Sequence, residues 1–159
     1  MEIKEQLFES LNDLLKINSE RITDYRKITD ELEVANLDIY AVCDKIIYQS
    51  QVNNMELENL SNKIACSLAY TYISGKAHRI WLKLKSVFIA KDRISILNFM
   101  DFNEEAAEKA YEYVINELSI SSEIKNVLTR QQLSLKTLHD IIKQINDSEI
   151  IEEKVYSYS

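Results

Sequence analysis

Proline is absent from this chain of 159 residues, and Gly75 is its only glycine. These two residue types interrupt helices and shape the tight turns between strands. A chain that nearly lacks both, and is rich in Leu, Ile, Glu, Lys and Ala, is typical of long helices. The scarcity argues against a β-rich fold and predicts a single all-α domain.

Cysteine is also scarce, and Cys43 and Cys66 lack the spacing of metal-binding or redox motifs. We expect two unpaired, buried thiols of the kind found in reducing compartments. No stretch of the chain approaches the roughly 20 apolar residues that a membrane-spanning helix needs. The charged residues 1–5 do not resemble a secretory signal. These features predict a cytoplasmic protein without a membrane span.

Positive charge is in the minority, and the net charge is −7. Because a general nucleic-acid binder needs clustered Lys and Arg, no nucleic-acid partner is expected. The distribution is uneven, however, since residues 76–93 carry a net charge of +5. This basic segment is either a surface for an anion, membrane or nucleic acid, or a crossover helix. In the second case four apolar residues would cap one end of the bundle: Ile80, Trp81, Leu84 and Phe88.

Apolar residues recur in steps of three and four along most of the chain, which indicates amphipathic helices. The predicted helices span about residues 7–32, 37–69, 77–90 and 93–118, and a last helix follows a tight connection at 119–122 and ends near residue 146. Asn36, Asp92 and a serine in that connection are predicted N-caps. Two short connections and one long crossover predict a ferritin-like four-helix bundle over residues 1–147. Its crossover, between the second and third long helices, carries the short extra helix. We expect a flexible tail over residues 148–159.

Three carboxylates interrupt an apolar stripe on the third long helix: Asp101, Glu104 and Glu108. Buried acids must be paired, protonated or bound to a cation. One interpretation is therefore a weak cation site formed by Asp101, Glu104 and His139. The alternative makes a neighbouring stripe the core face and leaves the acids solvated at its edge. On this alternative, replacing Glu104 by Gln leaves the stability unchanged or raises it.

A complete di-iron centre needs a Glu from each of two helices and Glu-x-x-His from each of the other two. Here Lys136 stands three positions before His139, and the second long helix has no histidine. The matching part of that helix, residues 51–54, includes two asparagines and no charge. We therefore expect no cofactor, or at most weakly bound iron or manganese.

Three further polar residues lie toward the interior of the predicted bundle: Tyr25, Tyr111 and Gln131. A buried phenol usually needs a hydrogen-bond partner. For the two tyrosines, Glu104 and His139 are candidate partners across the bundle, so their predicted role is structural.

Several short motifs carry a family resemblance. The most specific is the crossover motif Gly75-x-x-His78-Arg79-x-Trp81. Supporting patterns are residues 11–15, 24–27, 96–97, 101–106, 111, 127–131 and 139–140. Over roughly residues 8–147 the chain resembles an uncharacterised bacterial family of ferritin-like four-helix-bundle proteins. The resemblance implies the fold, without an established activity.

The chain also departs from this family's pattern. The family's acidic positions after the first-helix tyrosine fall on Lys27 and Asp30, and its arginine and aromatic in the second helix fall on Ser50 and Asn53. A Gly-Gly-x-Pro loop before the crossover is missing. These departures argue against metal chemistry inherited from ferritins.

Three functions follow from the sequence. The first is a non-enzymatic bundle that acts through protein association, in stress tolerance or as a structural accessory, with exposed apolar surface giving a homodimer or another self-associated form. The second is a weak metal-binding protein or vestigial di-iron oxidase. The third is association with membrane or nucleic acid through residues 76–93. The missing Glu-x-x-His pairs and the acidic net charge favour the first.

Overall fold

The computed structural model describes residues 3–65, 74–85, 92–117 and 120–157, and these ranges contain helices and no strand. The helices are α1 (Ile3–Glu31), the short 3-10 helix η1 (Val34–Asn36), α2 (Leu37–Ala65), α3 (Lys76–Leu84), α4 (Arg93–Glu117) and α5 (Ser122–Ser157). The predicted all-α class is confirmed. The predicted ends of three helices, at residues 69, 90 and 118, lie outside the described residues. None of the described helices combines the length and apolar character needed to cross a bilayer.

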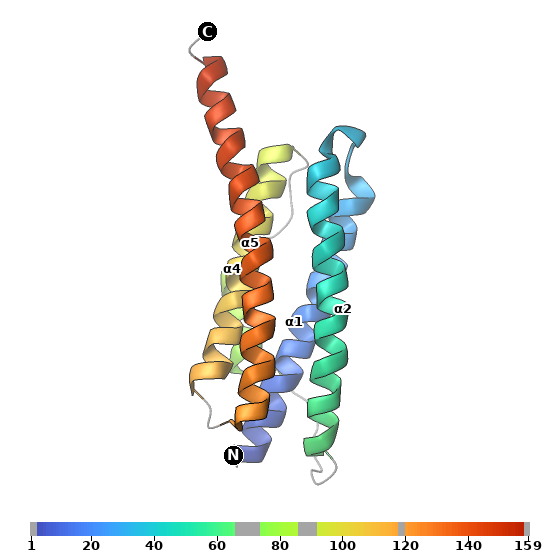
Figure 1. Ribbon diagram of the computed structural model, residues 1–159, viewed down its shortest axis with the longest axis vertical. Helices are drawn as coiled ribbons and strands as arrows, with labels where there is room; N and C mark the ends of the chain where they lie inside the picture. The colour runs from blue at the N-terminus through green and yellow to red at the C-terminus, as the bar shows by residue number, and fades with distance from the viewer. Residues whose placement is uncertain (1–2, 66–73, 86–91, 118–119, 158–159) are drawn as a thin grey trace.

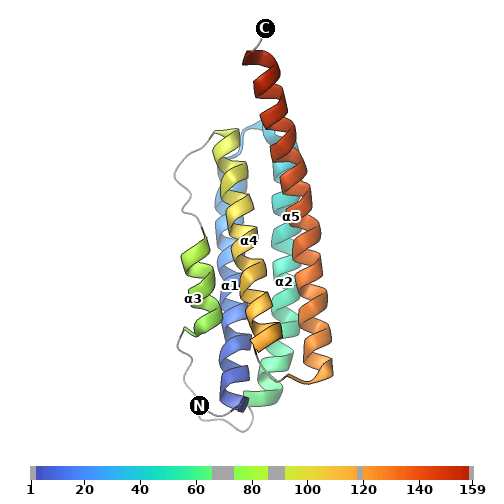
Figure 2. The same ribbon diagram turned by 90° about the vertical axis from the view of Figure 1, so that its left-hand side faces the viewer.

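Four long helices lie side by side, and their directions follow from the colours of Figure 1. From the N-terminus, α1 runs up, α2 runs down, α4 runs down and α5 runs up. The short connections make α1 and α2 one antiparallel pair and α4 and α5 another. Because α2 and α4 point the same way, the chain between them crosses back along the bundle, and it carries α3 (Figure 2).

Helix α3 packs along the side of the bundle, against α1 and α4 (Figure 2). Its Trp81 is completely buried in the same apolar cluster as Leu14 of α1 and Ala107 and Ala110 of α4. The small alanine side chains let α3 approach α4 closely enough to bury an indole. The predicted position of this helix over one end of the bundle is therefore wrong. Its Leu84 is exposed, and Phe88 lies outside the described residues.

A second apolar cluster fills the other part of the bundle, where Ile28 of α1 packs with Ile46 of α2, Met100 of α4 and Ile142 of α5. Cys43 belongs to this cluster and is unpaired. Burial raises the pKa of its thiol to about 12. Cys66 lies outside the described residues.

The predicted caps have different outcomes. Asp92 accepts a hydrogen bond from the backbone N–H of Ser95 at 3.0 Å and caps α4. Ser121 accepts one from the N–H of Ile124 at 3.3 Å and caps α5. Asn36 instead ends η1, and its side-chain oxygen accepts a hydrogen bond from Arg93.

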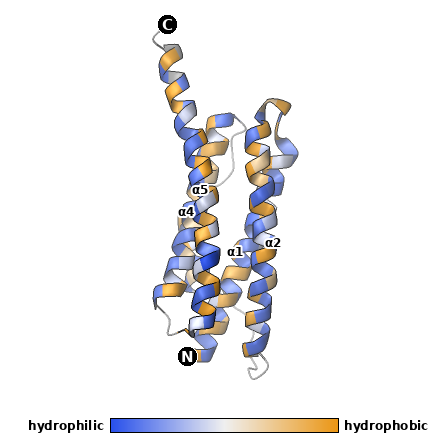
Figure 3. Cartoon of the chain, in the orientation of Figure 1, coloured by the Kyte–Doolittle hydropathy of each residue, from blue (hydrophilic) through white to orange (hydrophobic). Residues whose placement is uncertain are grey.

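Helix α5 is longer than the sequence pattern predicted. The tail expected to be flexible from residue 148 continues as helix to Ser157, because these residues include no helix breaker. Arg93 donates to Glu149 at 2.6 Å, close to the end of the bundle. Beyond Glu149 the helix projects past the other helices (Figure 1), and Figure 3 shows hydrophobic residues on the projecting part.

Candidate functional site

A buried ion pair lies in the interior of the bundle. Arg21 of α1 donates from Nη2 to Oε1 of Glu104 at 2.6 Å and from Nε to Oε2 at 3.2 Å. Tyr25, one turn further along α1, donates its hydroxyl to Oε2 of Glu104 at 2.7 Å. Neither Arg21 nor Glu104 is more than 1% exposed. The interpretation that left Glu104 solvated at a helix edge is therefore wrong.

Further hydrogen bonds extend from this pair through all four long helices. Arg21 Nη1 donates to the side-chain oxygens of Asn18 and Ser50, at 3.1 Å in both cases. Asn18 donates to the hydroxyl of Tyr111 at 2.9 Å. Tyr111 then donates to Gln131 Oε1 at 2.7 Å. The two predicted interior tyrosines are thus linked through Glu104, Arg21 and Asn18.

The network reaches the surface between α2 and α5. Gln131 Nε2 donates to the backbone oxygen of Asn53 at 3.3 Å and to Glu56 Oε1 at 3.2 Å. Glu56 also pairs with the half-exposed Arg130. The hydrogen bond from Arg130 lowers the pKa of Glu56 below its ordinary value. A continuous polar chain therefore joins the core to one outer edge.

Arg21 stays charged and the two tyrosines of this network stay neutral near neutral pH. Burial opposes the charged form of Arg21, but Glu104 outweighs it and raises the pKa of the guanidinium. Burial, assisted by Glu104, raises the pKa of Tyr25 well above 10, and burial raises that of Tyr111 to about 12. Both phenols therefore stay protonated near neutral pH and act as donors. These groups can orient helices, whereas acid–base catalysis needs a group that titrates near the working pH.

His139 clamps α4 to α5. Its Nε2 lies 2.5 Å from Asp101 Oδ1, and its Nδ1 lies 3.1 Å from Glu108 Oε1. Burial opposes the imidazolium, but the hydrogen bonds with Glu108 and Asp101 outweigh it and raise the pKa of His139 from 6.5 to about 9. The two carboxylates lie at opposite nitrogens of the ring. One cation at either nitrogen could therefore not bind both of them.

The structure brings together only part of the predicted cation site. Asp101 contacts His139, whereas Glu104 is held by Arg21 and Tyr25. Among the described residues, no group of three His, Cys, Asp or Glu side chains is arranged to hold a metal ion.

The crossover motif fixes α3 to α1 through a buried carboxylate. Asp13 of α1 accepts hydrogen bonds from the N–H of Gly75 at 2.8 Å and of His78 at 3.3 Å, and so caps the start of α3. A Cβ at Gly75 would lie closer to Asp13 and Glu9 than real Cβ atoms do. Gly75 is thus required by close approach, since its φ of −92° is ordinary.

The side chains of the motif add a second row of contacts between α3 and α1. The His78 ring lies 2.8 Å from Ser74 Oγ and 3.3 Å from Glu20 Oε1 through its two nitrogens. It stacks on Trp81 with the ring centroids 5.9 Å apart. Arg79 is exposed and donates to the backbone oxygen of Ser74 at 3.4 Å. This motif therefore has a structural role in docking α3.

Part of the basic charge of residues 76–93 is used inside the chain. Lys85 pairs with Asp24 at 3.4 Å and lies 4.2 Å from the centre of the Trp81 ring. Arg93 pairs with Asp38 at 2.5 Å and with Glu149 at 2.6 Å. These pairs reduce the charge that this segment can offer to a membrane or a nucleic acid.

Sequence reasoning missed Arg21, Asn18 and Asp13. A signal for the first two exists, because Asn18 and Arg21 interrupt the α1 stripe between Leu14 and Tyr25 in steps of four, three and four. The same signal singled out Glu104 on α4. Two polar interruptions of opposite charge on different helices predict a buried pair.

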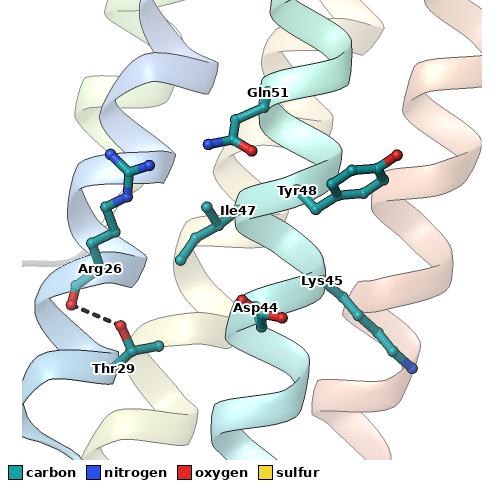
Figure 4. Close-up of a pocket in the computed structure, with 7 residues that line it drawn as sticks. All are labelled: Arg26, Thr29, Asp44, Lys45, Ile47, Tyr48 and Gln51. Carbon is teal, nitrogen blue, oxygen red and sulfur yellow. Dashed lines mark hydrogen bonds between the residues drawn. The ribbon is translucent and has the colours of Figure 1, made fainter.

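A groove of about 570 Å³ lies on the outer side of α1 and α2. Its lining residues are Arg26, Thr29, Asp44, Lys45, Ile47, Tyr48 and Gln51 (Figure 4). In Figure 4, the side-chain amide of Gln51 extends from α2 toward the guanidinium of Arg26 on α1, and Ile47 lies below both. We call this the α1–α2 groove.

Comparisons with protein-family models, curated proteins and solved structures gave no match to this chain. The functional proposal therefore rests on the geometry described above.

Proposed function

We propose that this chain is a ferritin-like four-helix bundle without a catalytic centre, which acts by association with another protein molecule. The order of helix directions and the long connection that carries α3 support the ferritin-like part, because bundles of that class have one long crossover.

The interior supports a structural role for the polar residues. Arg21 supplies a permanent positive charge to Glu104, since a guanidinium does not lose its proton at any physiological pH. Glu104 therefore has its counter-charge within the chain. This favours the association function over the weak metal-binding function, in which the same carboxylate would bind a cation.

The observation that carries the proposal is the projecting end of α5. We call residues 150–157 the α5 extension. Its Ile150, Ile151 and Val155 are 42%, 62% and 62% exposed, although they follow the last turn of α5 that pairs with α4. These residues continue α5 past the other helices (Figure 1), which leaves their apolar side chains uncovered. Exposed apolar residues on such a segment are typical of an interaction surface. Burying a fully exposed side chain of this kind gains about 1.5–3 kcal/mol, and these residues gain the share that is still exposed.

Affinity capture tests this function with two matched variants. The full chain is immobilised and presented to an extract of the cells that make it, beside I151D and L133D. Leu133 is the control because it lies on the same helix with a similar exposure, 64%, but alongside the bundle. We expect the unmodified chain and L133D to retain the same partner and I151D to lose it. Equal retention by I151D, or no retained partner at all, would contradict the proposal.

A further inference from the structure

We propose that the partner is a second copy of this chain, and that the α5 extension of each copy lies in the α1–α2 groove of the other. This inference rests on the proposed function, because it names the partner of the same surface.

The α5 extension combines apolar residues with a net charge of −1, since Glu152 and Glu153 outnumber Lys154. At 100° per residue, Ile151, Glu152 and Val155 fall within about one third of the helix circumference. All three side chains are exposed. The face is therefore suited to a groove that offers apolar contact and positive charge.

The α1–α2 groove has the complementary chemistry. Arg26 and Lys45 form no ion pair with another described residue, whereas Arg21, Lys85, Arg93 and Arg130 all do. With Asp44, these two cations leave the groove a net charge of +1 in a chain of net charge −7. Ile47 and Tyr48 supply apolar surface, and Tyr48 is 69% exposed.

Further exposed apolar residues lie nearer the turn between α1 and α2, and Leu37 and Tyr40 stand seven and four positions before Asp44, which places them on the same face of α2. Val34, Leu37 and Tyr40 are 85%, 69% and 49% exposed. A helix that enters the groove from this end would pass over them. Tyr is among the residues enriched in the buried parts of protein interfaces.

The position of the two surfaces excludes contact within one chain and permits exchange between two. The α5 extension leaves the bundle at the end where α1 meets α2, and it points away from these two helices, which line the groove (Figure 1). Its eight residues span about 12 Å, and Asp44 lies about 10 Å along α2 from Leu37. A two-fold axis through this end would direct each extension onto the α1–α2 pair of the other copy. Such reciprocal contacts close a dimer.

Sedimentation equilibrium of the full chain tests the exchange. We expect a dimer whose dissociation constant rises at least about tenfold in I151D and stays unchanged in L133D. R26E and E152K should each weaken the dimer, because each places like charges in both contacts. In an equimolar mixture of R26E and E152K, every contact regains opposite charges, so the affinity should return.

Two results would overturn the inference. An unmodified chain that stays monomeric at about 100 μM excludes the second copy as partner. A dimer that I151D leaves intact excludes the α5 extension and the α1–α2 groove as its interface. The same holds if R26E and E152K do not restore the affinity when they are mixed. Neither result decides the proposed function, since capture of a different protein that depends on Ile151 would still support it. A chain that stays monomeric and captures no other protein would contradict both this inference and the proposed function.

Discussion

Arg21 and Glu104 stand 83 positions apart in the sequence, yet the guanidinium and the carboxylate meet at 2.6 Å in the bundle interior. The pair joins α1 to α4, as do the hydrogen bonds of Tyr25 with Glu104 and of Asn18 with Tyr111. A buried charge that loses its partner is much less stable than the intact pair. The contact therefore makes the stability of the bundle depend on both residues.

Replacing Glu104 by Gln should destabilise the protein by about 3 kcal/mol, because Arg21 keeps its buried charge and loses its counter-ion. This expectation reverses the one drawn from the sequence alone. Urea denaturation followed by circular dichroism measures the effect. Glu105→Gln is the control, since Glu105 is exposed on the same helix. A loss below about 1 kcal/mol for E104Q would contradict the prediction.

Removing both charges should lower the free energy of unfolding by less than the sum of the losses caused by R21M and E104Q. We expect R21M combined with E104Q to be more stable than the sum of the two single effects, by on the order of 2 kcal/mol, because neither charge is then left unpaired. A double-mutant cycle from the same denaturation curves gives this coupling. Additive losses would show that the pair contributes through packing alone.

Because of His139, the free energy of unfolding should fall as the pH rises into the alkaline range. The pKa of His139 is raised from 6.5 to about 9 in the folded protein by Glu108 and Asp101, despite burial. The folded state therefore binds the proton more tightly, and the stabilisation is complete below pH 6.5 and is lost as the pH rises through about 9. Its size is at most about 3 kcal/mol, and solvent at Asp101, whose side chain is 33% exposed, reduces it.

The measurement for His139 is the free energy of unfolding from pH 6 to pH 10, compared between the unmodified chain and H139Q. The difference between the two should shrink as the pH rises, because H139Q lacks the titrating group. A difference that stays constant over this range would show that the imidazole is not charged in the folded protein.

Gly75→Ala should loosen α3 from the bundle. The added methyl group would collide with Asp13, whose carboxylate is fixed by two backbone N–H groups of the α3 start. We expect a loss of roughly 1–3 kcal/mol, as for other overpacked sites. An alanine that fitted without strain would instead stabilise the chain by about 0.4–1 kcal/mol.

Fluorescence of Trp81, the only tryptophan, reports this change directly. In G75A the emission should shift to longer wavelength at lower urea than the loss of helical circular dichroism. In Lys83→Ala, a change at an exposed position of α3, the shift in Trp81 emission and the loss of circular dichroism should occur at the same urea concentration. Unfolding of G75A with coincident transitions would show that α3 stays docked until the whole bundle unfolds.

Purified protein grown with iron and manganese should hold well below one metal ion per chain. The reason is that Arg21 already neutralises Glu104, and both nitrogens of His139 face carboxylates. Elemental analysis measures the content, with Glu104→Gln as the comparison. Two metal ions per chain, lost in that variant, would favour the metal-binding function instead.

Much of the helical architecture was predictable because it depends on local pattern. Steps of three and four placed the starts of the four long helices within a few residues of their observed positions, and Gly75 marks the start of α3. The absence of proline and the single glycine explain why long helices form. The end of α5 was missed for a related reason, since a polar stretch such as Asp147-Ser148-Glu149 resembles a helix end unless a breaker follows.

The candidate site was only partly predictable, because pairing across helices depends on helix rotation. Glu104 stood out as an acid on an apolar stripe, and Arg21 has the same property on α1. Periodicity alone did not show that these two face each other, nor that Glu104 turns away from His139. A rotation of α4 by one residue, 100°, would have exposed Glu104 to solvent.

The amino-acid sequence was sufficient for the helices, their approximate order and the long crossover, since these follow from turn-forming residues and hydrophobic period. Packing of the helices decided which polar groups are buried together, where α3 lies and which part of α5 remains uncovered. The physical reason is that secondary structure depends on neighbours along the chain. The Arg21–Glu104 pair, the Asp13 cap of α3 and the exposed Ile151 instead depend on contacts between distant segments.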